Sequence, residues 1–252
     1  MENSPFSLVG KNILVTGASS GIGRACAVES AKLGAKILAS GRDEERLAET
    51  LSQVSTEGST AVSADLLEFD FCKKISSAVP ADEPLDGIVF SAGMNRLLPV
   101  GFIGEKEFAA AMRVNAEAPL MLVQTLLREK KIKRGASIVF ISSISGGNVV
   151  SPGAAVYSAT KAAADALMKT MALELAAKQI RVNAICPGAV ETKMNALAAI
   201  SEAQKAEAGK RYPLKRFGKP EEIAYAAVYL LSDAAAWTTG TRIVIDGGFT
   251  LL

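Results

Sequence analysis

The chain has 252 residues, 49% of them hydrophobic and 21% charged, so it can bury the core of a folded domain, and a disordered chain is excluded. Its formal net charge of +2 is too balanced to indicate nucleic acid or a membrane surface as the main partner. It contains no histidine, which excludes histidine-dependent nucleophiles, histidine general bases and most zinc sites.

Seven short β-branched stretches alternate with longer helical patterns along the whole chain. Most of the seven are continuously apolar, as expected for parallel strands covered on both faces. The expected strands are 11–17, 35–40, 60–65, 86–93, 136–142, 180–188 and 241–248. Strands that alternate with helices predict right-handed β-α-β units. The fold class is therefore α/β, a single-domain Rossmann-type doubly wound sheet of about seven parallel strands with helices on both faces.

We expect one domain over residues 1–252, because the sequence contains no internal repeat, low-complexity tract or linker. The first helical pattern, 21–34, ends at Gly34 in the position of a helix C-cap. The least regular stretch is 189–220, which holds two prolines and many charges between two structured blocks. It predicts a mobile lid over a substrate site.

A glycine-rich turn directly follows the first expected strand. Gly17, Gly21 and Gly23 lie in ILVTGASSGIGRA, between that strand and the first helix. Glycines at such a turn let the backbone approach a pyrophosphate, whose charge then faces the helix N-terminus. The spacing G-x-x-x-G-x-G differs from the general G-x-G-x-x-G fingerprint. Its place between strand and helix nevertheless predicts binding of a dinucleotide cofactor.

Tyr157 and Lys161 stand four residues apart in the alanine-rich stretch AVYSATKAAADAL, residues 154–166. On a helix this spacing places both side chains on one face, one turn apart. Taken alone, the pair is more typical of a half-buried tyrosine and a solvated lysine. Since the chain has no histidine, however, proton chemistry must use Tyr, Lys, Asp or Glu, and the pair becomes a candidate for acid–base catalysis.

Further motifs occur in the order and at the separations of one protein family. They are SAG at 91–93, Asn115, ISSIS at 141–145 and PG at 187–188. The chain resembles the short-chain dehydrogenase/reductase family over essentially its whole length. Its nearest resemblance within that family is to the 3-oxoacyl-[acyl-carrier-protein] reductase branch, through GKPEEIA at 218–224 and the TGTRIVIDGG ending. One departure is Ser91, where many members carry asparagine in a mostly structural turn.

The resemblance implies four catalytic residues. Tyr157 resembles the general acid that protonates a carbonyl oxygen, and Lys161 resembles the residue that lowers the tyrosine pKa and holds the nicotinamide ribose. Ser143 matches the serine that hydrogen-bonds the substrate oxygen, with the neighbouring serines of ISSIS as rivals. Asn115 matches the asparagine that bends its helix and orders a water in a relay to the lysine, and a side-chain-to-backbone bond in mid-helix is compatible with that role.

The resemblance also implies the dinucleotide contacts. NAD-using members end the second strand with an acidic residue, whereas here Arg42 follows that strand, and its guanidinium suits a 2′-phosphate. Asp43 is the rival for the ribose contact, or else it caps the next helix. Asp65 matches an adenine contact, or else it caps its loop. The predicted cofactor is NADP(H), and its predicted contacts are Gly17, Ser19, Ser20, Gly21, Ile22, Gly23, Arg42, Asp65, Leu66, Ala92, Gly93, Tyr157, Lys161, Pro187, Gly188, Val190 and Thr192.

The resulting prediction is an NADP(H)-dependent oxidoreductase that reduces a carbonyl to a secondary alcohol by hydride transfer, with a 3-oxoacyl thioester among the candidate substrates. Two alternatives stay open. One is an NAD-dependent alcohol, sugar or steroid dehydrogenase. The other is a non-catalytic dinucleotide-binding protein, which would be expected to have lost Ser143, Tyr157 or Lys161.

The predicted partners are a small-molecule carbonyl compound or acyl thioester, and an acyl carrier protein. Carrier proteins are acidic, so a reductase that serves one needs basic residues near its cleft. The stretch REKKIKRG at 128–135 precedes the strand that leads to Ser143, and Arg134 and Lys178 match positions where carrier-using members present basic residues. An ordinary solvated helix end also explains the basic stretch.

The resemblance further implies a homotetramer, with a dimer as the runner-up. Segments 103–128 and 155–177 both carry small and apolar residues, and family members commonly pair these helices across a two-fold axis. The chain ends in DGGFTLL, whose Phe249, Leu251 and Leu252 offer a further apolar contact.

The cysteines and the N-terminal residues indicate the compartment. Cys26, Cys72 and Cys186 are widely spaced in apolar contexts, so we expect small core residues in a reducing compartment rather than disulfides or metal ligands. The first residues, MENSPFSLVGKNILV, are not typical of a signal peptide, and no run approaches 18 apolar residues. We therefore expect a cytoplasmic protein without a membrane partner or a bound metal.

Overall fold

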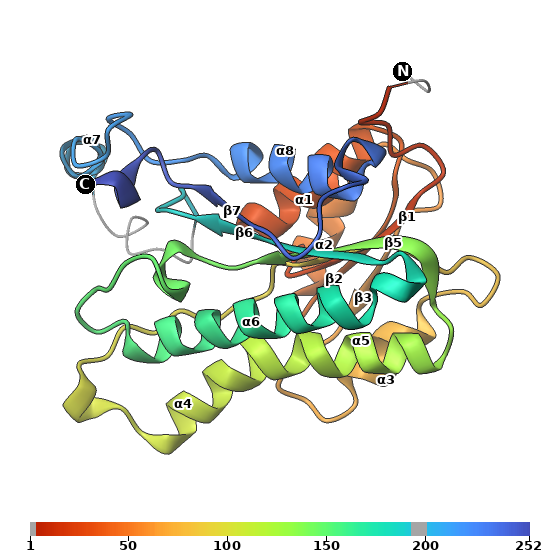
Figure 1. Cartoon of the computed structure of the whole chain (residues 1–252), viewed down its shortest axis with the longest axis horizontal. Helices are drawn as coiled ribbons and strands as arrows, with labels where there is room; N and C mark the ends of the chain where they lie inside the picture. The colour runs from red at the N-terminus through yellow and green to blue at the C-terminus, as the bar shows by residue number, and fades with distance from the viewer. Residues whose placement is uncertain (1–3, 193–200) are drawn as a thin grey trace.

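The computed structural model describes residues 4–192 and 201–252, and its strands form one parallel seven-stranded sheet (Figure 1). The strand order is β3-β2-β1-β4-β5-β6-β7, and every neighbouring pair is parallel. The strands are β1 Asn12–Thr16, β2 Lys36–Gly41, β3 Thr60–Ser63, β4 Leu85–Phe90, β5 Ile132–Ile141, β6 Arg181–Pro187 and β7 Arg242–Ile245. The predicted doubly wound α/β fold is confirmed.

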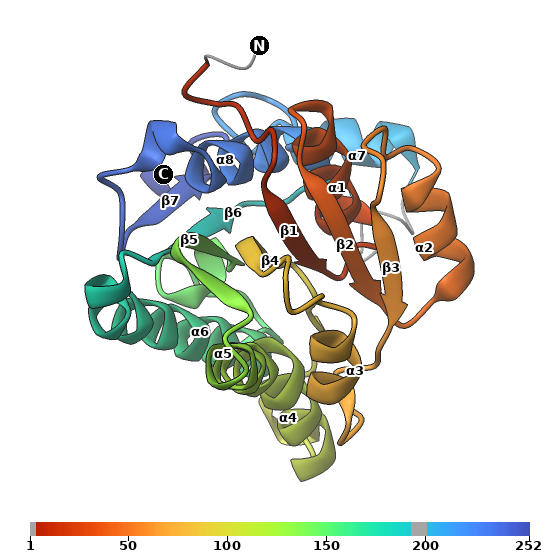
Figure 2. The ribbon, with the colours of Figure 1, turned by 90° about the vertical axis from the view of Figure 1, so that its right-hand side faces the viewer.

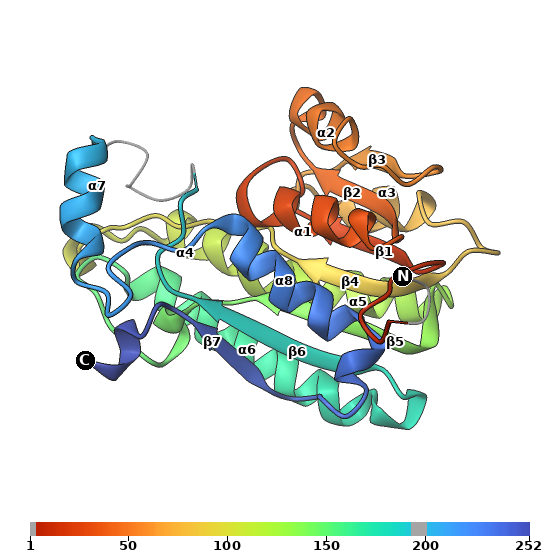
Figure 3. The same ribbon diagram turned by 90° about the horizontal axis from the view of Figure 1, so that it is seen from above.

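Helices cover both faces of the sheet, as Figure 2 shows. One face carries α1 (Gly21–Lys32), α2 (Glu44–Leu51) and α8 (Pro220–Leu231). The opposite side carries α3 Phe71–Ser77, α4 Glu105–Met112, α5 Ala118–Arg128 and α6 Ala155–Glu174. A short helix, α7 (Glu202–Gly209), stands beyond the end of the sheet to which the strands point (Figure 3). Among the described residues, no helix combines the length and apolar character needed to cross a bilayer.

Neighbouring residues of the central strands enter two different cores. Ile88 and Ile138 join the core beneath α5 and α6, while Val89 and Val139 join the core beneath α1 and α8. All four are 0% exposed. Side chains alternate between the faces of a strand, so a strand covered on both sides must be apolar at every position. Burying each such side chain contributes roughly 1.5–3 kcal/mol.

The strand order reverses direction between β1 and β4, which are hydrogen-bonded neighbours at the middle of the sheet. In open α/β sheets, ligands bind in the crevice outside the carboxyl ends of the strands at such a switch point. The first strand ends at Thr16 and the fourth at Phe90, so the glycine-rich turn and the SAG turn leave the sheet side by side. The fold therefore places both motifs at the expected crevice.

Strand β5 begins four residues before its predicted start. Ile132 pairs with Leu85 ahead of a register shift, and Lys133 Nζ lies 2.6 Å from Asp86 Oδ2. Part of the basic stretch 128–135 is therefore strand rather than a connection. The pairing partner lies on another strand, so local periodicity did not reveal it.

The helical segment expected at 103–128 is interrupted by a π-helical turn, η2 (Arg113–Glu117), between α4 and α5. Helix α1 ends as predicted: the backbone at Gly34 has φ +96°, and its N–H donates to the Ala31 carbonyl at 2.9 Å. A left-handed conformation of this kind favours glycine just beyond a helix.

The segment 189–220, expected to be a lid, is anchored at both described ends. The Glu191 N–H donates to the Gly218 carbonyl at 2.9 Å, and the Gly218 N–H donates to the Ala189 carbonyl at 3.0 Å. The Tyr212 ring lies 4.8 Å from the Phe249 ring, between centroids. Residues 193–200 of the expected lid lie outside the described part of the chain. Its motion stays a prediction.

Candidate active site

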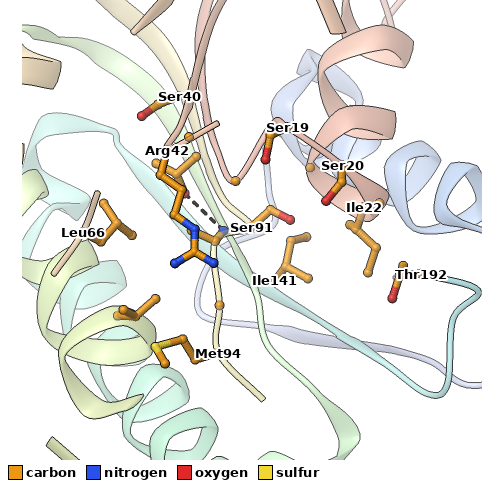
Figure 4. A pocket seen from close by; sticks show the side chains of 18 of the residues that line it. Ser19, Ser20, Ile22, Ser40, Arg42, Leu66, Ser91, Met94, Ile141 and Thr192 are labelled. Carbon is orange, nitrogen blue, oxygen red and sulfur yellow. Dashed lines mark hydrogen bonds between the residues drawn. The ribbon is translucent and has the colours of Figure 1, made fainter. Parts of the chain in front are cut away.

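A pocket of about 380 Å³ opens at the carboxyl ends of the strands (Figure 4). Every residue predicted to contact a dinucleotide lies on its wall, and so do three of the four predicted catalytic residues, Ser143, Tyr157 and Lys161. The fourth, Asn115, lies behind the wall. The fold thus brings together motifs from across the chain.

The glycines of the turn are required by close backbone contacts. Gly17 has φ +69°, and a Cβ there would lie 2.6 Å from the Ala92 nitrogen. A Cβ at Gly23 would lie 2.2 Å from the Gly17 carbonyl oxygen. No side chain caps the N-terminus of α1, so its first N–H groups remain available at the pocket. A narrow backbone turn at an uncapped helix N-terminus fits a pyrophosphate.

Two side chains outside the pocket wall hold the glycine-rich turn in place. Arg24 Nη2 donates to the Ser19 carbonyl at 2.7 Å, and Thr50 Oγ1 donates to the Ala18 carbonyl at 2.8 Å. Arg24 Nε also donates to Thr50 Oγ1 at 3.0 Å, which links α1 to α2. Sequence reasoning missed both residues because their partners are backbone oxygens, which leave no residue pattern.

Arg42 and Asp43 follow β2 but differ in what they contact. Asp43 Oδ1 accepts a hydrogen bond from the Arg46 N–H at 3.1 Å, and its Oδ2 lies 3.2 Å from Arg46 Nε. Asp43 is therefore the N-cap of α2. The exposed Arg42 side chain points into the pocket, as Figure 4 shows.

Asp65 lies on the wall and also caps its own loop. Its Oδ1 accepts a hydrogen bond from the Leu67 N–H at 2.9 Å. The loop-capping role considered from the sequence is therefore present. Contact with an adenine stays a prediction.

The Lys161 side chain is buried, and its ammonium lies beside the end of β5. It is 6% exposed, and its ammonium donates to the Ile141 carbonyl at 2.8 Å. Its Nζ lies 5.7 Å from the centre of the Tyr157 ring. Burial lowers the pKa of Lys161 to about 8, and the Asp165 carboxylate opposes that fall.

The pKa of Tyr157 lies above its ordinary value, although Lys161 was expected to lower it. Burial raises the pKa of Tyr157, and a hydrogen bond with Ser143 opposes the rise. Desolvation disfavours the charged form of a phenol, and here it outweighs the neighbouring groups. The phenol therefore keeps its proton at neutral pH, which is the state that a general acid needs.

Ser143 is the serine of ISSIS that faces Tyr157. It is 7% exposed and follows β5 as the N-cap of a short 3₁₀ turn, η3 (Ile144–Gly146), where its hydroxyl accepts from the Ser145 N–H at 3.1 Å. Its rival Ser142 also lies on the wall, but Ser145 does not. Ser143 lowers the pKa of Tyr157 against the effect of burial and neither rival does, which distinguishes Ser143 from both.

Asn115 sits in the π-helical turn η2 and joins three segments. Its Oδ1 accepts from the Met94 N–H at 2.7 Å, and its Nδ2 donates to the Met94 carbonyl and to Thr160 Oγ1, each at 2.9 Å. The side-chain-to-backbone bonds thus reach the loop after β4 rather than its own helix. A Cβ at Gly93 would lie 3.4 Å from Asn115 Oδ1 and 3.7 Å from Lys161 Nζ, so both side chains approach that glycine.

Arg134 and Lys178 lie together but away from the pocket. Arg134 Nη1 donates to the Ala177 carbonyl at 3.2 Å, next to Lys178 in the 3₁₀ turn η4 (Ala176–Lys178) after α6. Helix α6 has 20 residues and is therefore about 30 Å long, with Tyr157 in its first turn. The expectation that these basic residues lie near the cleft is wrong within a single chain.

The remaining wall residues were not predicted as contacts. Most are immediate neighbours of predicted residues at strand ends, and that position was the signal that could have found them. They are Thr16, Ser40, Gly41, Asp43, Arg46, Ala64, Leu67, Ser91, Met94, Val114, Ile141 and Ser142. The three cysteines are free, and residues 4–192 and 201–252 contain no cluster of three metal-ligating side chains.

Comparisons with known proteins agree with this geometry. The family model described as Enoyl-(Acyl carrier protein) reductase matches residues 17–250. Oxidoreductase UcpA of Salmonella typhimurium is 37% identical over 97% of this chain and 96% of its own length. The 5-keto-D-gluconate 5-reductase of Escherichia coli is 34% identical over 98% of both chains. The 3-oxoacyl-[acyl-carrier-protein] reductase FabG of Rickettsia prowazekii is 33% identical over 98% of this chain and its full length.

Solved structures share the whole fold. A chain from Sinorhizobium meliloti described as a short-chain alcohol dehydrogenase has a TM-score of 0.90 and 33% identity, covering 98% of this chain and 99% of its own. A second solved chain, from Beutenbergia cavernae, is described as an NAD(P)-dependent gluconate 5-dehydrogenase with bound NADP at low occupancy. It has a TM-score of 0.88 and 31% identity, and the match covers 99% of this chain and 100% of its own. The site and the fold define a nicotinamide-dependent oxidoreductase. The chain belongs to the short-chain dehydrogenase/reductase family.

Proposed function

We propose that the protein is an NADP(H)-dependent reductase that converts a carbonyl to a secondary alcohol. One observation carries the proposal: Ser143, Tyr157 and Lys161 share a pocket with the glycine-rich turn and Arg42. Arg42 follows β2 and Ser143 follows β5, three strands away in the sheet. With strands about 4.8 Å apart, this separation is about 14 Å. It suits a dinucleotide that extends across the switch point.

The wall residues divide the binding task by their chemistry. The N–H groups at the start of α1 would hold the pyrophosphate, and Arg42 would bind a 2′-phosphate. Lys161 and Tyr157 would hold the nicotinamide ribose. Pro187, Gly188, Val190 and Thr192 would complete the wall around the nicotinamide. When bound, the cofactor supplies the hydride that is added to the carbonyl carbon.

The chain's own groups handle the oxygen of the substrate. The Tyr157 phenol, protonated at neutral pH, donates its proton to the carbonyl oxygen. The Ser143 hydroxyl, which lies on the same pocket wall as the phenol, would orient the same oxygen. The Lys161 ammonium then stabilises the tyrosinate that remains. Asn115 fixes the Met94 loop against α6 and thereby supports the geometry of the wall.

The preference for NADP(H) rests on what Asp43 contacts. A ribose-binding carboxylate needs free oxygens at the end of β2, but both Asp43 oxygens face Arg46. Arg42, the first residue after β2, lies on the pocket wall, and a 2′-phosphate would pair with its guanidinium. The Beutenbergia cavernae structure, solved with NADP, supports the same choice.

Two of the relatives support candidate substrates of different chemistry. The FabG relative supports a 3-oxoacyl thioester on an acyl carrier protein, and the gluconate relative supports a small oxo acid. We propose a homotetramer, which the exposed alanines of α6 support. Three free thiols far apart in the sequence support a cytoplasmic location.

The test is turnover of purified protein with NADPH and a panel of carbonyl compounds that includes a 3-oxo ester, a keto sugar acid and an aromatic ketone. We expect carbonyl-dependent oxidation of NADPH, with a higher kcat/KM than for NADH. Binding of NADPH without turnover of any compound would favour the non-catalytic alternative. Faster turnover with NADH would favour the NAD-dependent dehydrogenase.

A further inference from the structure

A buried ion pair lies directly behind Lys161. Asp165 follows Lys161 by one turn on the same face of α6 and is 5% exposed. Its Oδ2 lies 2.8 Å from Arg242 Nε, at the start of β7. Neither residue lies on the pocket wall, and neither takes part in the proposed reaction.

The same pair supports the turn that carries Ser143. A Cβ on Gly146 would lie 2.9 Å from Asp165 Oδ2 and 3.3 Å from Lys161 Cβ, so η3 rests on these two residues with no room for a side chain. Arg242 Nη2 also donates to Asn148 Oδ1 at 2.7 Å, just beyond that turn. The ion pair therefore connects α6 and β7 with the backbone that follows Ser143.

The charge of Asp165 acts on Lys161. Burial raises the pKa of Asp165, while the Ser142 hydroxyl, Arg242 and Lys161 oppose the rise. In return, Asp165 raises the pKa of Lys161 against a larger lowering by burial. A buried ion pair is often no more stabilising than an apolar pair of similar volume, so its charge here calls for a role beyond stability.

The other groups facing this cluster are few. The Tyr157 phenol and Lys169 lie on α6, and the Cys186 thiol, whose pKa is raised chiefly by burial, lies on β6. In the part of the chain that the structure describes, the end of β5 and the turn η3 present no titratable side chain to Lys161. Asp165 is thus the group on this side that supplies negative charge to the ammonium at neutral pH.

We propose that Asp165 is a positioning residue: held by Arg242, its carboxylate keeps the Lys161 ammonium charged and seats the Ser143 turn on α6. This inference rests on the proposed function of Lys161 and goes beyond it. It predicts that removal of the carboxylate acts mainly at alkaline pH, where Lys161 loses its proton. Simple loss of packing would instead reduce activity at every pH.

The test compares Asp165→Asn with the wild type by kcat/KM from about pH 6 to 10, with NADPH and ethyl acetoacetate as the probe ketone. The alkaline limb of the variant should move about one pH unit lower, the size expected from losing a nearby opposite charge. Near pH 6, where Lys161 is protonated in both proteins, kcat/KM should agree within about 3-fold. The affinity for NADPH against pH, measured by the fluorescence of the bound cofactor, should show the same shift without turnover.

Two further variants keep the result interpretable. The double variant Asp165→Asn/Arg242→Gln removes both charges of the ion pair, so it leaves no unpaired buried guanidinium. Its alkaline limb of kcat/KM should still lie at lower pH than that of the wild type. Asp86→Asn breaks the ion pair with Lys133 at the other end of the sheet and should leave the limb in place. An unshifted limb in both Asp165 variants would overturn the inference. Absence of turnover in the wild type would overturn the proposed function instead, and the binding profile would still decide the role of Asp165.

Discussion

The Tyr157 phenol is the group from which the proposed reaction takes its proton. Tyr157→Phe keeps the ring and removes that proton, so kcat should fall by at least ~100-fold, the scale of general acid–base catalysis. The Kd for NADPH should change far less than kcat, because Lys161 still holds the nicotinamide ribose. Steady-state kinetics and fluorescence titration measure the two quantities.

A second tyrosine provides the control for this variant. Tyr229 lies on α8, away from the pocket wall, and its hydroxyl lies 3.1 Å from Thr238 Oγ1. Tyr229→Phe should therefore leave kcat unchanged. Near-normal kcat in Tyr157→Phe, under conditions where chemistry limits the rate, would exclude the acid role.

Arg42 is the residue on which cofactor choice should depend. Arg42→Ala should narrow the preference for NADPH over NADH by about 1–3 kcal/mol, the range of a charge-assisted contact. The ratio of the two kcat/KM values measures it. Asp43→Asn keeps a side chain that can cap α2, so the preference should persist. If the wild type prefers NADH, we would infer that an acidic residue, and not Arg42, governs binding of the ribose.

Residues with a fixed place in a motif could be predicted, and residues defined by their surroundings could not. Tyr157 and Lys161 were predicted as site residues from the family resemblance, and the structure places both on the pocket wall. The upward shift of the Tyr157 pKa was not predicted, because it comes chiefly from burial, which is a property of the folded chain. Asp165 gave no signal, since its partner Arg242 is distant in the sequence and meets it only in the folded chain.

The connection between α1 and α2 should control how well the glycine-rich turn binds phosphate. Arg24→Leu removes the bond to the Ser19 carbonyl, which then loses a charged donor. We expect the Kd for NADPH to rise about 10-fold, equivalent to roughly 1.4 kcal/mol, while kcat at saturating cofactor stays within a few-fold. Calorimetric titration and steady-state kinetics separate the two effects.

The control lies on the same helix. Lys32 pairs with Glu29 on the exposed part of α1, with 2.7 Å between Nζ and Oε1. Lys32→Met should leave the Kd for NADPH unchanged. An equal rise in both variants would mean that the helix as a whole, and not its contact with the turn, had been disturbed.

Elements were predictable where the pattern was local. All seven strands overlap the β-branched stretches that predicted them, most of which are continuously apolar. The early start of β5 was missed because Ile132 joins the sheet through Leu85, on another strand. The resemblance implied a bend in the helix at Asn115, and a π-helical turn lies there. The bond from the Met94 backbone to Asn115 was not predicted, because a contact of this kind has no periodicity.

The exposed face of α6 predicts how copies of the chain assemble. Ala155, Ala159, Ala162 and Ala166 are exposed and recur at helical spacing, so another helix can approach closely. We expect a homotetramer at micromolar concentration. Ala166→Arg should reduce the molar mass measured by light scattering, whereas Ala48→Arg, on the exposed face of α2, should not. A monomeric wild type would contradict the assembly.

This assembly bears on the carrier protein. Arg134 and Lys178 lie about 30 Å from Tyr157 within one chain, at the far end of α6. If two α6 helices pair antiparallel across a two-fold axis, the Lys178 end of one copy lies beside the Tyr157 end of the other. The basic residues would then face a cleft only in the assembled protein.

The last prediction therefore concerns steering of an acyl carrier thioester. We expect its kcat/KM to exceed that of the same acyl chain on a short thiol by about 10-fold at low salt and to lose that advantage as ionic strength rises. Arg134→Glu with Lys178→Glu should abolish the advantage, and so should Ala166→Arg if the copies complete the site. The control is Lys73→Glu with Lys74→Glu on α3, which changes the net charge by the same amount. This variant should keep the advantage of the carrier thioester. Equal kcat/KM for both thioesters at every salt concentration would exclude the carrier and leave a small ketone as the substrate.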